Sequence, residues 1–67
     1  MAARGTYTLI YKGFLFEGDG LGWNFHDYDD WGEIISIYDF YADAYPDLEM
    51  EIRHNEYGVT LRNGEWS

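Results

Sequence analysis

The sequence predicts a small α+β domain in which one helix lies across a small antiparallel sheet, in the order β-β-α-β-β. Two observations predict this fold class. Four short segments alternate apolar and polar residues with the period of a half-buried strand. Between the second and third segments, residues 30–45 repeat their apolar side chains at the spacings of an amphipathic helix. The chain has 67 residues, so we expect a single domain, residues 1–67.

The first two strands are expected in residues 6–16 and from Trp23 onward. In the first, Tyr7, Leu9 and Tyr11 alternate onto one face. The apolar phase changes at Gly13, which indicates a β-bulge or a tight turn. A glycine-rich turn at residues 17–22 then leads into the second strand.

The helix is expected over residues 30–45. Asp30 can cap its N-terminus, and Glu33, three residues later, completes a capping-box pattern. Pro46 ends the helix, because the residue before a proline avoids the α region. The apolar stripe of this helix consists of Trp31, Ile34, Ile35, Tyr38, Tyr41, Ala42 and Tyr45.

Two more strands are expected after the helix. Leu48, Met50 and Ile52 alternate with charged residues, and the segment Asn55-Glu56 is a plausible hairpin turn. A last strand is predicted at residues 57–62, before the Asn63-Gly64 turn signal.

Charge distinguishes this chain from an ordinary small domain. It has 4 Lys and Arg against 13 Asp and Glu, a net charge of −9. No lysine or arginine lies between Lys12 and Arg53, a stretch that holds most of the acids. The same stretch is rich in aromatic and aliphatic residues, which disordered acidic tails lack. We therefore expect a folded acidic surface, although a solvated face without a partner would have the same composition.

The acids are predicted to lie in rows. Asp39 and Asp43 share the helix face opposite the apolar stripe, about 6 Å apart. The acids at positions 47, 49 and 51 are expected on one side of the following strand, about 6.6 Å apart. Regularly spaced negative charge is what a nucleic-acid strand offers to a basic groove. The candidate partner-binding acids are Asp27, Asp29, Asp30, Glu33, Asp39, Asp43, Asp47, Glu49 and Glu51.

Ile37 and Phe40 lie between the apolar stripe and the acidic face of the helix. They either widen the contact with the core or serve as apolar anchors inside an acidic rim, the arrangement of a protein–protein hot spot.

The segment Trp23-Asn24-Phe25-His26-Asp27-Tyr28-Asp29-Asp30-Trp31, followed by an acidic amphipathic helix, resembles part of the ArdA-type antirestriction proteins. The resemblance covers residues 23–45 of a chain much smaller than the elongated, multi-domain ArdA proteins, which mimic bent DNA and block restriction enzymes. Size and charge are also similar to those of small phage anti-CRISPR proteins. These resemblances imply a DNA-mimic role for Asp27, Asp29, Asp30 and Glu33, and no catalytic residues.

Other functions are disfavoured by the sequence. Counting an EF-hand loop from Asp27 puts Trp31 at position 5 and Tyr38 at position 12, so the pattern fails. A looser calcium site at Asp27–Glu33, in a small acidic binding or adaptor module, stays an alternative. The chain has no cysteine and no recognisable catalytic motif, so we expect neither an enzyme nor a cofactor. Direct binding to nucleic acid or to a membrane would be repulsive.

The sequence therefore predicts a non-enzymatic DNA-mimic inhibitor. An anti-CRISPR protein that occupies the basic DNA-binding surface of a CRISPR effector complex is the first hypothesis, and an antirestriction protein is the second. We expect it in the cytoplasm of a bacterial host cell, without a signal peptide, as a monomer or a weak homodimer.

Overall fold

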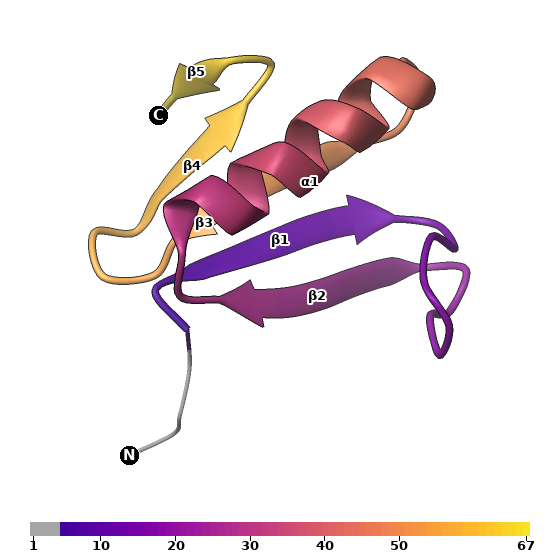
Figure 1. The fold of residues 1–67 in the computed structure, drawn as a ribbon, viewed down its shortest axis with the longest axis horizontal. Helices are drawn as coiled ribbons and strands as arrows, with labels where there is room; N and C mark the ends of the chain where they lie inside the picture. Colours follow the sequence, from indigo (N-terminus) through magenta and orange to yellow (C-terminus); the bar gives the residue numbers. More distant parts are fainter. Residues whose placement is uncertain (1–4) are drawn as a thin grey trace.

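A five-stranded antiparallel sheet carries the single helix on one of its faces (Figure 1). The computed structural model describes residues 5–67. The strands are β1 (Tyr7–Lys12), β2 (Trp23–Tyr28), β3 (Met50–His54), β4 (Val59–Arg62) and β5 (Glu65–Trp66), and the helix α1 is Trp31–Ala44. The strand order is β2-β1-β3-β4-β5. The predicted α+β class and the order β-β-α-β-β are confirmed, and β5 is added at the end.

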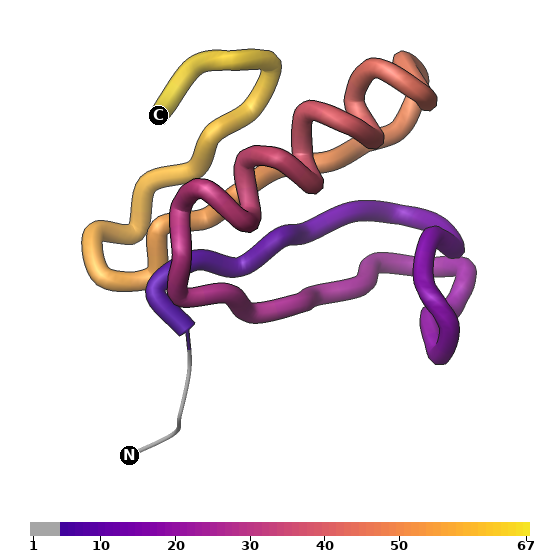
Figure 2. The backbone as a smooth tube through the Cα atoms, viewed as in Figure 1, coloured from indigo at the N-terminus to yellow at the C-terminus, as the bar shows by residue number. Residues whose placement is uncertain are grey.

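The chain path explains why one face of the sheet is covered and the other is open. After β2 the chain enters α1, which crosses the sheet, and it then returns as β3 (Figure 2). The helix contacts β1, β2 and β3. Within the described part of the chain, no helix is long and apolar enough to cross a membrane.

The core lies between α1 and the two central strands. Leu9 and Tyr11 of β1, Ile52 of β3 and Ile34 of α1 are fully buried. Leu9 is paired with Ile52 in the sheet, so both side chains point toward the helix. The predicted alternation of β1 is therefore confirmed.

The caps of α1 follow the sequence signals. Asp30 has an extended backbone, and its Oδ2 accepts a hydrogen bond from the Glu33 N–H at 2.9 Å. Tyr45 closes the other end by donating its N–H to the Tyr41 carbonyl at 2.9 Å. Ile34 and Tyr38 of the predicted apolar stripe are buried and Ile35 and Tyr41 are partly buried. Trp31, Ala42 and Tyr45 are exposed, so this part of the stripe was predicted wrongly. With 14 residues, α1 is about 21 Å long, whereas β3, with five residues, is only about 17 Å long. Strand β3 therefore cannot cover the whole helix.

Two expectations about the last strands need correction. Tyr57 was expected to begin the last strand, but it lies in an exposed four-residue turn, Asn55–Gly58. Gly58 closes this turn with a φ of 72°, a left-handed conformation that suits glycine. The Asn63-Gly64 turn does not end the sheet, because it leads into β5. Strand β5 was not predicted, because a strand of two residues is too short to show an alternation of apolar and polar residues.

Candidate functional site

The charged side chains of residues 5–67 are divided between the two faces of the sheet. Side chains alternate along a strand, so Lys12 points away from the helix because its neighbour Tyr11 points toward it. Arg53 is opposite Thr8, and the same alternation directs both away from the helix. Arg62 joins them, since it is bonded to Glu51 on that face. All three cations of the described chain therefore lie on the open face.

Among the described residues, the lysines and arginines are all absent from the helix side, which carries acids. We call the following set of exposed residues the acidic helix surface: Asp29, Asp30, Glu33, Asp39, Asp43 and Asp47. No lysine or arginine among residues 5–67 forms an ion pair with any of them. Asp29 and Asp30 also serve the fold, because Asp29 Oδ1 accepts from the Thr6 N–H at 3.1 Å and Asp30 caps α1. Within residues 5–67, the second carboxylate oxygen of each accepts no hydrogen bond.

Within this surface, Asp39 and Asp43 stand one helical turn apart on the face opposite the buried Ile34 and Tyr38. Phe40 lies beside them and is 65% exposed, with only its neighbour Tyr41 as an aromatic contact. The surface therefore combines acids that form no ion pair with a lysine or arginine of residues 5–67 with the exposed apolar side chain of Phe40. Ile37, the other candidate anchor, is half-buried against the core.

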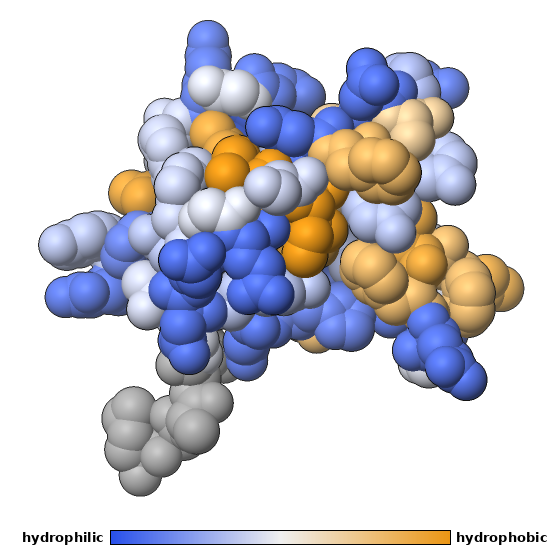
Figure 3. Space-filling model, viewed as in Figure 1, coloured by the Kyte–Doolittle hydropathy of each residue, from blue (hydrophilic) through white to orange (hydrophobic). Residues whose placement is uncertain are grey.

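Hydrophilic side chains dominate the view from the helix side (Figure 3). Hydrophobic side chains are visible at the centre of this view, and others gather at one end, over the connection between β1 and β2. Phe14 and Leu21 of that connection are both largely exposed.

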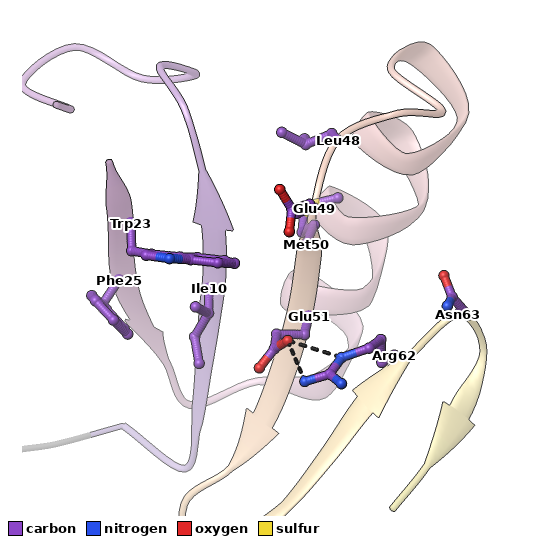
Figure 4. Close-up of a pocket in the computed structure, with 9 residues that line it drawn as sticks. All are labelled: Ile10, Trp23, Phe25, Leu48, Glu49, Met50, Glu51, Arg62 and Asn63. Atoms are coloured by element: carbon purple, nitrogen blue, oxygen red, sulfur yellow. Dashed lines mark hydrogen bonds and ion pairs between the residues drawn. The ribbon is translucent and has the colours of Figure 1, made fainter. Parts of the chain in front are cut away.

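The other predicted acids, Asp27, Glu49 and Glu51, lie on the open face, and two of them have side-chain partners there. Asp27 Oδ1 accepts from the Thr8 hydroxyl at 2.7 Å. Glu51 Oε2 accepts from Arg62 Nε at 3.0 Å and from Nη2 at 2.8 Å (Figure 4). Asp27, Glu49 and Glu51 are thus separated from the acids of the helix.

Of the expected row of acids at positions 47, 49 and 51, Glu49 and Glu51 lie together on the open face, whereas Asp47 lies in the turn before them. Strand β3 begins at Met50, and Asp47 lies in the turn that follows Pro46. The row on the strand side is therefore limited to Glu49 and Glu51, and Asp47 lies in the turn that follows the C-terminal end of α1. Strand alternation alone could not place the point where the turn ends.

A shallow groove of about 680 Å³ runs along the open face (Figure 4). Trp23 and Phe25 of β2, with Ile10 of β1, form one wall. Glu49 and the Glu51–Arg62 pair lie on the opposite wall. The open face therefore mixes aromatic side chains with charges of both signs.

Sequence reasoning missed the role of Asp19. Its side chain is only 3% exposed and accepts hydrogen bonds from the backbone N–H groups of Leu15 and Phe16 at 3.1 and 2.8 Å. The Tyr11 hydroxyl donates to the same carboxylate, and His26 Nε2 lies 3.1 Å from its other oxygen. This network ties the β1–β2 connection to the core. The available signal was an aspartate among glycines, a residue type that bonds nearby backbone groups in turns.

Burial alone would raise the pKa of Asp19, but the hydrogen bonds it accepts from Tyr11 and from backbone N–H groups together lower that pKa well below its ordinary value. Burial and the bond to Asp19 raise the pKa of Tyr11 above its usual range. The pair therefore stays as a carboxylate and a neutral phenol at neutral pH. A group held in this state positions a loop and does not exchange protons.

The acids around the start of α1 do not converge. Among residues 5–67, no group of three or more His, Asp or Glu is arranged to hold a metal ion. Comparison with protein-family models, with curated proteins and with solved structures finds no match for this chain.

Proposed function

We propose that this protein is a non-enzymatic inhibitor of a nucleic-acid-binding complex, and that its acidic helix surface occupies a basic surface normally reserved for DNA. One observation carries the proposal: six exposed acids surround α1 without a single ion-paired lysine or arginine among the described residues, while Lys12, Arg53 and Arg62 all lie on the opposite face. Ordinary protein surfaces mix charges of both signs.

Two features of the acidic helix surface support a partner over a merely solvated face. Asp39 and Asp43 repel each other at i,i+4, and Asp43 also lies at the helix end where the macrodipole disfavours anions. Neither the Asp39–Asp43 repulsion nor the position of Asp43 stabilises the helix. Residues that lower stability in this way are expected at functional surfaces. Exposed Phe40 supplies an apolar contact that hydration alone does not require.

The proposed mechanism is competition with DNA. Long-range attraction between a chain of charge −9 and a basic groove speeds association. Carboxylates at Asp39, Asp43 and Asp47 then take the places of phosphates, and Phe40 completes the contact. A CRISPR effector complex in a bacterial cytoplasm is the first target class, and a restriction enzyme is the second because of the resemblance at residues 23–45.

The test is binding to purified CRISPR effector complexes and restriction enzymes, with labelled target DNA as competitor. We expect binding that excludes DNA and that weakens by at least about tenfold between roughly 0.1 M and 1 M salt, as the Debye length falls from about 10 Å to about 3 Å. The double variant D39K/D43K should abolish it.

The matched control is E56K/E65K, which reverses two exposed acids outside the acidic helix surface and changes the net charge by the same amount. We expect this control to retain most of the binding. Equal loss in both double variants would mean that only net charge matters, and retained binding in D39K/D43K would refute the assignment of the surface.

A further inference from the structure

The two edges of the sheet differ in length. Strand β5 forms one edge and has only two residues. Strand β2 forms the other edge, has six residues, and is paired only with β1 among the strands of the described chain. Short edges resist pairing with another chain, whereas a full-length edge presents a row of backbone groups to a partner.

The register shows which backbone groups of β2 are free. The Gly13 N–H donates to the Gly22 carbonyl at 2.9 Å, so residues 13 and 22 form a hydrogen-bonded pair. Such pairs recur at every second position of an antiparallel ladder. In β2 they fall on Asn24, His26 and Tyr28, which are opposite residues 11, 9 and 7 of β1. The N–H and C=O groups of the other three residues, Trp23, Phe25 and Asp27, therefore point outward.

The side chains of the same three residues lie on the open face. Trp23 is 49% exposed and Phe25 is 63% exposed. Edge strands that avoid association carry charged side chains, especially lysine, or proline or a bulge, and the only acid of β2 is Asp27. Strand β2 has no proline and no lysine, and its register with β1 runs without interruption. The exposed aromatic side chains and the free backbone thus form one continuous surface.

We propose that this edge binds a second copy of the chain, with the two β2 strands antiparallel about a two-fold axis at Phe25. A two-fold axis perpendicular to the sheet keeps both open faces on the same side, so Trp23, Phe25 and Asp27 must be opposite one another. All three outward-pointing residues of each strand are paired only when the two-fold axis passes at Phe25. Phe25 is then opposite Phe25 of the second copy, and Trp23 is opposite its Asp27.

Self-complementarity favours a second copy over an unrelated strand. The four aromatic rings form one cluster, because each Trp23 is a diagonal neighbour of the other copy's Phe25. The two Asp27 carboxylates lie at opposite ends of the pairing. The result is a continuous ten-stranded sheet with both helices on one face. Two copies of charge −9 repel each other, so association is weak at low salt and strengthens when salt screens the repulsion.

The first experiment is sedimentation equilibrium over a concentration series at about 0.1 M and about 1 M salt. We expect a monomer–dimer equilibrium that shifts toward the dimer at high salt, which is opposite to the salt effect on the proposed inhibition. A chain that stays monomeric at both salt concentrations would overturn the proposal. The acidic helix surface is not part of this interface, so either proposal can fail without the other.

The second experiment compares F25K with F40K. Both phenylalanines are exposed to nearly the same extent, 63% and 65%, and both variants have the same net charge. We expect F25K to weaken dimerisation by at least about tenfold, as the loss of a central interface residue does. F40K should leave dimerisation unchanged or slightly stronger, because the copies repel less. Equal weakening by both variants would contradict the proposed edge.

Amide hydrogen exchange then locates the contact. In the dimer, the N–H groups of Trp23, Phe25 and Asp27 should become protected, because each gains a backbone acceptor. Those of Asn24 and His26 are bonded to β1 in either state and should change little. A dimer without new protection at Trp23, Phe25 and Asp27 would mean that the copies associate elsewhere.

Discussion

A single carboxylate, Asp19, organises a ten-residue connection. Burying a charged group is unfavourable unless several donors compensate it. Here the Tyr11 hydroxyl and the backbone N–H groups of Leu15 and Phe16 donate to Asp19 Oδ2, while His26 contacts Oδ1. The connection between β1 and β2 is consequently tied to Tyr11 and His26, which flank it in the two strands.

We predict that Asp19→Asn lowers the melting temperature at pH 7 by about 4–8 °C, the shift expected for loss of one such interaction in a domain of this size. The pKa of Asp19 is lower in the folded chain than its ordinary value of 3.8. Its stabilising contribution is therefore fully present above about pH 5 and is lost as the pH falls toward and through the folded pKa.

The difference in melting temperature between wild type and D19N should accordingly be constant above about pH 5 and shrink below about pH 4. Comparing the two chains removes the effect of the other acids, which relieve repulsion when they become protonated. A difference that does not depend on pH would show that Asp19 acts by shape alone.

At the scale of elements, α1 shows where fold and proposed function need different residues. Its start follows the rules of helix stability, with Asp30 as cap and Glu33 in the first turn. Its last turn has no basic residue and carries Asp43 instead. The N-terminal half is therefore built for stability, whereas the C-terminal half keeps an unfavourable charge that the proposed partner would use.

We predict that Asp43→Lys raises the free energy of unfolding by about 0.5–1 kcal/mol, because the new cation suits the helix C-terminus and attracts Asp39. The same variant should weaken partner binding.

Asp30→Ala should lower the free energy of unfolding by about 1 kcal/mol through loss of the cap. Urea unfolding measures both, and a destabilised D43K would show that Asp43 serves the fold.

At the scale of the whole molecule, charge is distributed by face. The acidic helix surface has six exposed acids, and none of them forms an ion pair with a lysine or arginine of residues 5–67. The open face compensates three cations with the nearby acids Asp27, Glu49, Glu51 and Glu65. A partner of positive charge is therefore directed to the helix, and a second copy of the chain meets least repulsion at the sheet.

We predict that the melting temperature of the monomer rises by several degrees between about 0.1 M and 1 M sodium chloride, because salt screens the repulsion within a chain of charge −9. The rise should be smaller for D39K/D43K, which removes part of that repulsion. Calorimetry at low protein concentration keeps dimerisation out of the measurement. A melting temperature that falls with salt would indicate that ion pairs such as Glu51–Arg62 outweigh the repulsion.

The sequence alone determined the helix, its caps, the alternation of β1 and β3, and the excess of acids, because these depend on neighbours within a few residues. Only the tertiary structure decided which face each acid occupies, since that depends on the pairing of strands far apart in the chain. Contacts between distant parts of the chain also decided three other features: the burial of Asp19, the pairing of Glu51 with Arg62, and the free edge of β2. Local patterns specify which side of an element is apolar, but the strand order specifies what that side and its edges meet.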